Sequence, residues 1–387
     1  MKRTVSGRYE TTAVGGETVR SFVPHPLPPA PAVDLGGERL RLLERAHLAC
    51  GRLDGIAVLL PDPDLFLYAY VRREAVLSSQ IEGTQSSLSD LLLFELEDAP
   101  GAPFDDVVEV SNYVAALELG LARMRGGFPL SARLIRELHG RLLSSGRGAS
   151  ASPGEVRTSQ NWVGGTRPGN AVFVPPPAHL VGDCIGDLER YIHARQDGLP
   201  ALVRAGLAHV QFETIHPFLD GNGRVGRLFI ALMLFDSGIL AQPLLYLSLY
   251  LKQHRDEYYR LLNAVRTDGD WEAWLEFFLE GVAETSQSAF DTAHRLLALF
   301  RADAQRVQAL GRPSSSVLRV FDALRARPVA TPQSLVNRAG VSYVTVLRAL
   351  DALGGLGIVR EITGRKRERV FAYGEYLDVL SEGTKPL

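Results

Sequence analysis

The sequence has few of the features that mark disulfide-bonded, metal-rich or membrane proteins. Its 387 residues include only two cysteines, Cys50 and Cys184, which lack metal-ligand spacing and fit a reduced, cytoplasmic protein. No apolar run approaches the roughly 18 residues that a membrane helix needs, so we expect no membrane partner. The start of the chain has basic residues but no apolar stretch, which argues against a signal peptide. A net charge of −2 gives no overall field that would attract nucleic acid or a membrane surface.

The densest group of chemically useful residues is a polar loop, HPFLDGNGRVGR, at 216–227. Apolar runs at 201–215 and 228–240 predict a helix on each side of it. The centre of the loop is Gly221, Asn222 and Gly223. These residues can aim successive backbone N–H groups at one point, and a helix that begins near Asn222 adds its positive dipole end. The loop therefore predicts an anion site.

The side chains of this loop supply the remaining parts of a nucleotide site. Arg224 and Arg227 are three residues apart, so they share a helix face and are both placed to reach one polyphosphate. Asp220 is a hard oxygen ligand, suited to Mg²⁺ shared with phosphate oxygens. His216 can take a proton near neutral pH. The alternative is a glycine-rich connection with ordinary helix capping, but the whole set favours a nucleoside triphosphate, a metal and a hydroxyl to be deprotonated.

The loop resembles the signature of Fic-domain proteins, H-x-F-x-[DE]-G-N-G-R-x-x-R, at every fixed position. The resemblance implies transfer of AMP from ATP to a Ser, Thr or Tyr hydroxyl of a protein. It implies that Asp220 holds Mg²⁺ and that the Gly221–Gly223 backbone holds the α- and β-phosphates. Arg224 and Arg227 would hold the β- and γ-phosphates, and His216 would take the proton of the target hydroxyl.

A second segment, SSQIEG at 78–83, has two interpretations. By itself it is a solvent-facing glutamate before a glycine that ends a helix. It is also similar to the inhibitory helix of Fic proteins, [ST]-x-x-x-E-[GN], with Ser78, Glu82 and Gly83 at the matching positions. The resemblance implies a bidentate pair between Glu82 and Arg227, which would occupy the guanidinium that the γ-phosphate needs.

The chain divides by composition into three parts. Residues 1–104 comprise a stretch rich in Pro, Gly and Val at 1–37, expected to be an extended arm or irregular cap packed on the body, and helices over 38–60 and 65–80. An acidic Pro/Gly break at 97–102 precedes the Fic-like core and bridging helices, 105–310. A further break leads to a separate unit, 313–387.

Within the core, two β-prone runs near QNWV and AVFV flank a Gly/Pro/Asn turn and predict a hairpin. In Fic proteins this position is the flap, where a target segment adds as a strand. By that resemblance the residues that border the site are Val163, Gly164, Gly165 and Thr166. The region near 258 walls the adenine pocket in the family, which makes Tyr258 or its neighbour Tyr259 the expected contact. His209 fits a core or capping residue, because no metal-ligand set surrounds it.

Residues 313–387 predict three helices followed by two short strands joined by GRKRE. This order resembles a winged-helix domain, whose third helix and basic wing bind DNA in some proteins and whose surface binds protein in others. The stretch has 11 Lys and Arg against 7 Asp and Glu, a net charge of +4. The expected wing contacts with DNA phosphates are Arg365, Lys366, Arg367 and Arg369.

The sequence therefore predicts an all-α fold: an N-terminal helical segment, a Fic core with a β-hairpin flap, and a C-terminal winged helix. The expected activity is AMP transfer from ATP with Mg²⁺, restrained by Glu82. Three alternatives stay open: removal of AMP from a modified protein, a DNA-binding regulator that uses the core as a nucleotide sensor, and a neighbouring Fic chemistry such as phosphorylation or transfer of another nucleotide. The target protein is not readable from the sequence, although self-modification is a reasonable first product and a homodimer is left open.

Overall fold

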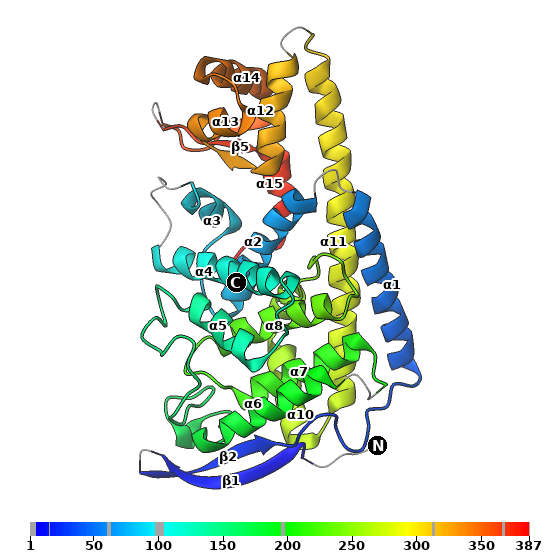
Figure 1. Cartoon of the computed structure of the whole chain (residues 1–387), viewed down its shortest axis with the longest axis vertical. Coiled ribbons are helices and arrows are strands. Elements are labelled where there is room, and N and C mark those ends of the chain that lie inside the picture. Colours follow the sequence, from blue (N-terminus) through cyan, green and yellow to red (C-terminus); the bar gives the residue numbers. More distant parts are fainter. Residues whose placement is uncertain are drawn as a thin grey trace.

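The computed structural model of the chain is elongated, and helices run along most of its length (Figure 1). The structure describes residues 5–14, 16–59, 63–96, 104–194, 198–311, 314–365 and 368–386, with the backbone alone at 57–59, 63–66 and 104. Within these ranges the chain is mostly helical with two small antiparallel sheets, in agreement with the predicted class. The break predicted at 97–102 lies outside the described residues. No described helix has both the length and the apolar character needed to cross a membrane.

The body is a set of helices packed beside one long helix. Their bounds are α1 (Glu38–Leu59), α2 (Pro63–Ile81), α3 (Leu88–Phe94), α4 (Phe104–Arg125), α5 (Ala132–Leu142), α6 (Ala178–His193), α7 (Ala201–Ile215), α8 (Asn222–Asp236), α9 (Ser248–Gln253), α10 (Arg255–Asp268) and α11 (Trp271–Gln308). The 38 residues of α11 span about 57 Å at the usual rise per residue. α1 packs along α11, while α7 lies against α6, α8 and α11, so the buried α7–α8 pair sits inside the helical body.

The N-terminal stretch is not an extended arm, which corrects the sequence prediction. β1 (Gly7–Val14) and β2 (Glu17–Pro24) form an antiparallel hairpin across the bottom of the body (Figure 1). Alternating β-prone residues on both sides of a glycine pair are a hairpin signal, and the prolines that follow obscured it. Phe22 and Val23 are buried, so the segment does pack on the body as expected.

The predicted flap hairpin is present only in reduced form. A single antiparallel bridge joins Val163 and Phe173, and the turn between them contains a short 3-10 helix, η1 (Pro168–Asn170). Gly164 and Gly165 both have positive φ, and prolines at 175–177 lack the N–H groups that a longer ladder would need. The N-terminal hairpin supports the flap, because the Phe22 N–H donates to the Val174 carbonyl at 2.9 Å.

The C-terminal unit, residues 314–386, lies at the far end of α11 from the hairpin (Figure 1). Its elements are α12 (Ser314–Ala326), β3 (Val329–Ala330), α13 (Pro332–Ala339), α14 (Tyr343–Gly355), β4 (Val359–Glu361), β5 (Phe371–Tyr373) and α15 (Gly374–Leu380). The strands pair in the order β3-β5-β4. The sequence did not predict α15, which returns the chain to α2 and α11 in the body.

Candidate active site

The loop between α7 and α8 is closed by its own side chains. α7 ends at Ile215, and the next residue, His216, has a φ of 48°, in the left-handed region that non-glycine residues seldom adopt. Asn222 opens α8; its Oδ1 accepts from the Phe218 N–H at 2.9 Å, and its Nδ2 donates to the Phe218 carbonyl at 2.8 Å. The Asn222 side chain is therefore used inside the loop, which leaves its backbone N–H, in the first turn of α8, for a bound anion.

The predicted anion nest takes the form of a helix N-terminus. Of its three residues only Gly221 is left-handed, with a φ of +76°, because Asn222 and Gly223 already belong to α8. Gly223 allows another side chain to approach closely: a Cβ at this position would lie 2.4 Å from Glu82 Oε1. The carboxylate of Glu82 thus lies over the first turn of α8, where the helix dipole favours negative charge.

His139 holds the apolar side of the loop and has no signal in the sequence. Its ring stacks on Phe218 with centroids 3.8 Å apart. Its Nδ1 accepts from the Gly154 N–H at 2.9 Å, which leaves Nε2 to donate to the Asp220 carbonyl at 3.0 Å. Burial lowers the pKa of His139 to about 4, so the ring is neutral and stays in this arrangement near neutral pH.

Two further residues that sequence reasoning missed fix the polar side of the loop. The Arg157 Nε donates to the His216 carbonyl at 2.9 Å, and the Arg157 N–H donates to the Pro217 carbonyl at 3.0 Å. Asn161 Nδ2 donates to the Phe218 carbonyl at 2.8 Å. These bonds explain how a left-handed histidine persists, since strained backbone survives only where its surroundings over-determine it.

Arg227 is buried and is held by two residues of the SSQIEG segment. Its Nε donates to Ser78 Oγ at 2.8 Å, and its Nη2 donates to the Ser78 carbonyl at 2.9 Å and to Glu82 Oε1 at 2.7 Å. The sequence predicted a bidentate pair with Glu82, but one carboxylate bond forms because Ser78 takes the Nε edge of the guanidinium. Gly83 has a φ of +98°, which suits glycine at the end of α2.

The charge of Glu82 is stabilised by its partners. Its side chain is 32% exposed. Burial alone raises the pKa of Glu82, but the charge and hydrogen bond of Arg227, with smaller effects of Arg224 and His216, hold it below its usual range. The same pairing raises the pKa of Arg227 despite the burial of its guanidinium. Both groups are therefore ionised near neutral pH.

Arg224 has a different partner from Arg227, although the two share a helix. Its Nη1 lies 3.0 Å from Glu109 Oε2, and the side chains of both residues are 2% exposed. Arg147 also pairs with Glu109, at 3.0 Å. Burial raises the pKa of Glu109, and the two arginines oppose that shift. No sequence pattern points to Glu109, because it lies more than a hundred residues upstream of Arg224 and belongs to no local motif.

Asp220 is the only carboxylate in the 216–227 loop, and its side chain is 44% exposed. Its Oδ1 accepts from the Gly221 N–H at 2.6 Å, and its Oδ2 lies 3.7 Å from Arg224 Nη2. Among the described residues no set of three or more His, Cys, Asp or Glu side chains could hold a metal. A single exposed carboxylate fits Mg²⁺ held jointly with phosphate and water, and does not fit a metal held by protein ligands alone.

The environment of His216 keeps its imidazole neutral. Burial is the main cause, and the positive charges of Arg266 and Arg157 add to it, so that the pKa of His216 falls to about 4. Arg266 itself donates to Thr214 Oγ1 at 3.2 Å and lies over the Phe173 ring at 3.8 Å, which connects the base of the flap to the site. A neutral imidazole near pH 7 is the form that accepts a proton.

Glu213, one turn before His216, is a buried carboxyl that the sequence analysis did not single out. Among the described residues no hydrogen-bond partner reaches its Oε1, and a Cβ at Gly226 would lie 2.1 Å from that atom. Burial raises the pKa of Glu213 to about 7, partly opposed by Arg227. The raised pKa favours the neutral form of this carboxyl, which lies near the Glu82–Arg227 pair.

The tyrosine pair divides between the core and the surface. Tyr258 is 1% exposed, and its hydroxyl donates to His209 Nε2 at 2.9 Å, while His209 Nδ1 donates to the Gly226 carbonyl at 3.0 Å. His209 is therefore the core histidine that the sequence suggested. Tyr259 is 39% exposed and close enough for its pKa to respond to Glu82 and Arg227. Of the two rings, Tyr259 is the more accessible to a ligand.

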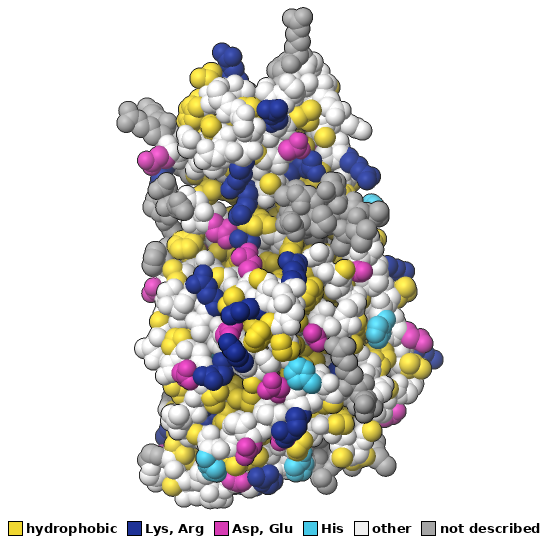
Figure 2. All heavy atoms as spheres, in the orientation of Figure 1, with side chains coloured by type: hydrophobic (Ala, Val, Ile, Leu, Met, Phe, Trp, Pro, Cys, Tyr) yellow, Lys and Arg dark blue, Asp and Glu magenta, His cyan; other side chains and the backbone are white. Residues whose placement is uncertain are grey.

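In the described part of the chain, none of the other predicted site residues forms a hydrogen bond or ion pair with the 216–227 loop. Gly164, Gly165 and Thr166 are exposed at the tip of the flap, and Val163 belongs to its only bridge. In the segment predicted to be a wing, Arg365 faces Glu368 at 3.9 Å and Arg369 lies over Phe371, whereas Lys366 and Arg367 are outside the described residues. On the face shown in Figure 2, Lys and Arg side chains are interspersed with Asp and Glu across the molecule.

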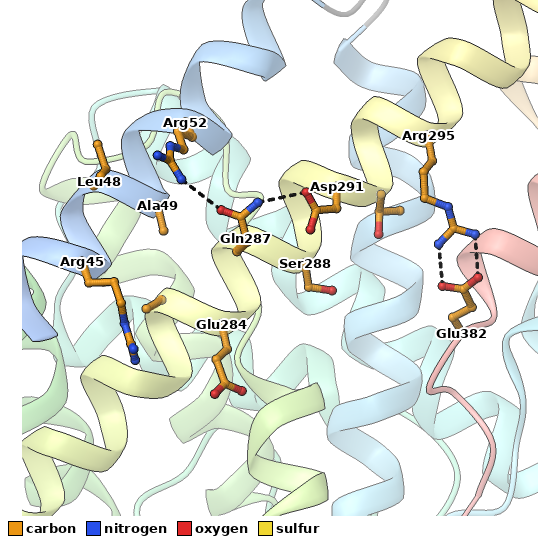
Figure 3. Close-up of a pocket in the computed structure, with 12 residues that line it drawn as sticks. Arg45, Leu48, Ala49, Arg52, Glu284, Gln287, Ser288, Asp291, Arg295 and Glu382 are labelled. Atoms are coloured by element: carbon orange, nitrogen blue, oxygen red, sulfur yellow. Dashed lines mark hydrogen bonds and ion pairs between the residues drawn. The ribbon is translucent and has the colours of Figure 1, made fainter.

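A separate surface groove of about 640 Å³ lies between α1 and α11 (Figure 3). Its charged lining includes Arg45, Arg52, Asp291, Arg295 and Glu382, and none of its lining residues belongs to the 216–227 loop. Positive and negative side chains pair with one another or with amides along it, so it presents no field of one sign.

Comparison with known proteins agrees with this geometry. Residues 40–122 match the model of the Fic/DOC family N-terminal region, and residues 129–234 match that of the Fic/DOC family. A protein adenylyltransferase Fic of Culex quinquefasciatus is 30% identical over 210 residues, which cover 53% of this chain and 39% of that protein. The Drosophila melanogaster protein of the same name is 28% identical over 186 residues, 48% of this chain and 35% of its own length. The chain thus spans less than half the length of these curated relatives.

Solved structures show the same fold. A Fic family protein from Desulfovibrio desulfuricans superposes with a TM-score of 0.58 at 21% identity, over 88% of this chain and 97% of that one. Fic-1 from C. elegans gives a TM-score of 0.50 at 22% identity, over 67% and 73% of the two chains. With its N-terminal region, its core and its complete loop all matched, the chain is a Fic-domain protein.

Proposed function

We propose that this protein transfers AMP from ATP to a Ser, Thr or Tyr hydroxyl of a protein, and that Glu82 restrains the reaction. The observation that carries the proposal is the meeting of His216, Asp220, the first turn of α8 and Arg227 in one loop, with Glu82 on Arg227 at 2.7 Å. A loop of this kind is suited to positioning a triphosphate and neutralising its charge, which is most of what transfer at phosphorus requires.

The residues divide the work as follows. His216, neutral near pH 7, accepts the proton of the target hydroxyl while the hydroxyl oxygen forms a bond to the α-phosphorus. The bond from the α-phosphorus to its bridging oxygen breaks, and pyrophosphate leaves. The first turn of α8 and the two arginines carry the phosphate charge. Mg²⁺, when bound at Asp220, supplies further positive charge to the phosphate oxygens.

The test uses ATP radiolabelled at the α-phosphate, with the protein itself as the first acceptor examined. His216→Ala should keep ATP binding, measured by calorimetry, and lose label transfer. If His216→Ala still transfers label, His216 is not the group that accepts the proton of the target hydroxyl. A matched control is His193→Ala, which removes an exposed histidine at the end of α6, outside the site.

The reverse reaction is the second candidate, and one observation favours it. Only Oε1 of Glu82 bonds to Arg227, and the side chain is partly exposed, so the other oxygen is available to orient a water. Incubation with an AMP-modified protein separates the two directions, because release of AMP that depends on Glu82 supports removal. Transfer that rises when Glu82 is replaced supports addition.

DNA binding by the C-terminal unit remains an additional hypothesis. It is favoured by α14, whose first residues, Tyr343 and Val344, are 49% and 57% exposed, as expected of a helix that enters a groove. A gel-shift assay on the full chain at stated salt concentrations tests it, since phosphate contacts weaken steeply with salt.

A further inference from the structure

α2, which carries Ser78 and ends one residue before Glu82, has a second set of partners on another face. Gln80 of α2 is 2% exposed, and its amide is fully used. Its Nε2 donates to the Ser86 carbonyl at 2.9 Å and to the Thr384 carbonyl at 2.8 Å, while its Oε1 accepts from Lys252 Nζ at 2.6 Å. A residue two positions before Glu82 is thus bonded directly to the segment that follows α15.

This segment, residues 381–386, is called here the latch segment. Lys252 of α9, itself buried, also donates to the Gly383 and Lys385 carbonyls. Arg73, two helical turns before Gln80, donates to the Glu382 carbonyl at 2.8 Å. Side chains from the body therefore donate hydrogen bonds to four successive backbone carbonyls of the latch segment, at residues 382–385. These contacts depend on the conformation of that backbone.

Three features set the conformation of the latch segment. Gly383 has a φ of +77°, and a Cβ there would lie 2.8 Å from Leu249 Cδ1. Glu382 forms two bonds to Arg295 of α11, at 2.7 and 2.8 Å, drawn in Figure 3. Thr384 is 3% exposed, so the segment is buried in the body and does not merely lie on the surface.

The C-terminal unit also holds the opposite end of α2. The Arg327 guanidinium, just after α12, lies 3.6 Å from the ring centroid of Tyr68 and 3.6 Å from Glu95. Glu95 in turn pairs with Arg72 at 2.8 Å. The unit thus contacts α2 near its beginning through Tyr68 and near its end through Gln80.

Loss of the latch would leave buried polar groups of α2 and α9 with fewer partners. The amide of Gln80, the ammonium of Lys252 and the guanidinium of Arg73 would each lose a carbonyl acceptor. Unpaired buried polar groups are costly, so α2 would have to shift or loosen to hydrate them. Ser78 and Glu82 are rigid parts of the same helical end, and their fit to Arg227 would change with it.

We propose that the latch segment holds α2 in the inhibitory position, so that displacing residues 381–386 is the step that frees Arg227 from Glu82. This inference rests on the proposed function for its effect on activity. It assigns the C-terminal unit a definite role: any partner that draws the unit or its latch segment away from α2 activates the site.

The experiment uses the full chain with Gly383→Val, which disturbs the latch backbone without altering α2, and a second variant that lacks residues 381–387. Asp378→Asn is the matched control, because it breaks an exposed ion pair with Arg360 on the same unit and does not contact α2. Label transfer should rise about fivefold or more in both latch variants and stay unchanged in the control. In a Glu82→Gly background, Gly383→Val should add nothing further.

Amide hydrogen exchange supplies a readout that does not require transfer. Residues 78–84 should exchange faster in Gly383→Val than in the native chain and Asp378→Asn. Unchanged exchange in both latch variants overturns the proposal. The latch proposal is also overturned if both latch variants fold and transfer label at the native rate while Glu82→Gly is active. That result leaves the proposed function intact. An inactive Glu82→Gly form contradicts the proposed function. The exchange rates of residues 78–84 then still show whether the latch segment holds α2.

Discussion

Glu82 Oε1 lies 2.7 Å from Arg227 Nη2, although the two residues are 145 positions apart in the chain. The bond joins the end of α2 to the first turns of α8, over a glycine whose missing Cβ makes room for the carboxylate. Arg227 is therefore shared between an internal acid and any phosphate that enters the loop. This competition, with the charges around it, sets how the site responds to substitution and to pH.

Replacing Glu82 should release the arginine. Glu82→Gly is expected to raise transfer of label from ATP by about tenfold or more, since the competing charge and the bulk over Gly223 both disappear. Glu82→Gln keeps the size and removes the charge, so it should give an intermediate rise. If the native chain and both variants transfer label equally, Glu82 does not inhibit the reaction.

The inhibition should be insensitive to mild acid. The folded pKa of Glu82 is depressed, so its pairing with Arg227 is complete above the unfolded carboxyl value of 4.5 and is lost only as pH falls through the folded value. The ratio of transfer by Glu82→Gly to transfer by the native chain should therefore stay constant between about pH 6 and 9. A ratio that collapses near pH 6 would contradict the assigned ionisation.

The loss of transfer activity at low pH should depend on the charge of Arg266. Burial and then the Arg266 charge lower the pKa of His216 to about 4, so in a Glu82→Gly background transfer should not decline until the pH approaches that value. Arg266→Gln removes one positive charge, so the decline of transfer activity should begin at a higher pH. Arg266→Lys keeps the charge, so the decline should begin at the same pH as with Arg266. The pH profile of kcat/KM distinguishes them, and identical shifts in the two variants would exclude the electrostatic cause.

Glu213 should make the fold less stable at high pH. Its folded pKa of about 7 exceeds the unfolded value of 4.5, so the folded chain retains a proton that the unfolded chain has lost. Stability therefore falls as pH rises through that window, by at most about 3 kcal/mol. Glu213→Gln removes this titration, and its gain in unfolding free energy over the native chain should grow from pH 5 to 8. Parallel pH dependence in denaturant titrations would contradict the raised pKa.

The loop was predictable because its groups are consecutive. His216, Asp220, Asn222 and Arg227 are brought together by one turn and the start of one helix, so local spacing describes most of their arrangement. Glu82 was different: its own hexapeptide indicates only a helix end, and the similarity to an inhibitory helix pointed to Arg227. The single carboxylate bond was not predictable, since it depends on where Ser78 lies.

The supporting residues could not be found from the sequence. Glu109, His139 and Arg157 lie 59 to 115 positions from the loop groups that they contact, and no spacing rule connects them. They meet the loop because α4, α5 and the segment before the flap pack around α7 and α8. The N-terminal hairpin was missed for a different reason, because the proline-rich stretch after it dominated the interpretation.

The latch segment shows the same limit. Body side chains bind its backbone carbonyls, and a carbonyl is common to every residue, so the sequence of 381–386 contains no signal of the contact. Only the return of α15 to the body shows that the C-terminal unit is connected to α2.

The most direct test of the central claim is the intact mass of three full-length forms after incubation with ATP and Mg²⁺: the native chain, Glu82→Gly, and Glu82→Gly with His216→Ala. A tryptic map of each form locates any modification. The account predicts adenylyl groups on Ser, Thr or Tyr in Glu82→Gly, fewer in the native chain and none in the double variant. Adenylylation that persists without His216 would contradict it.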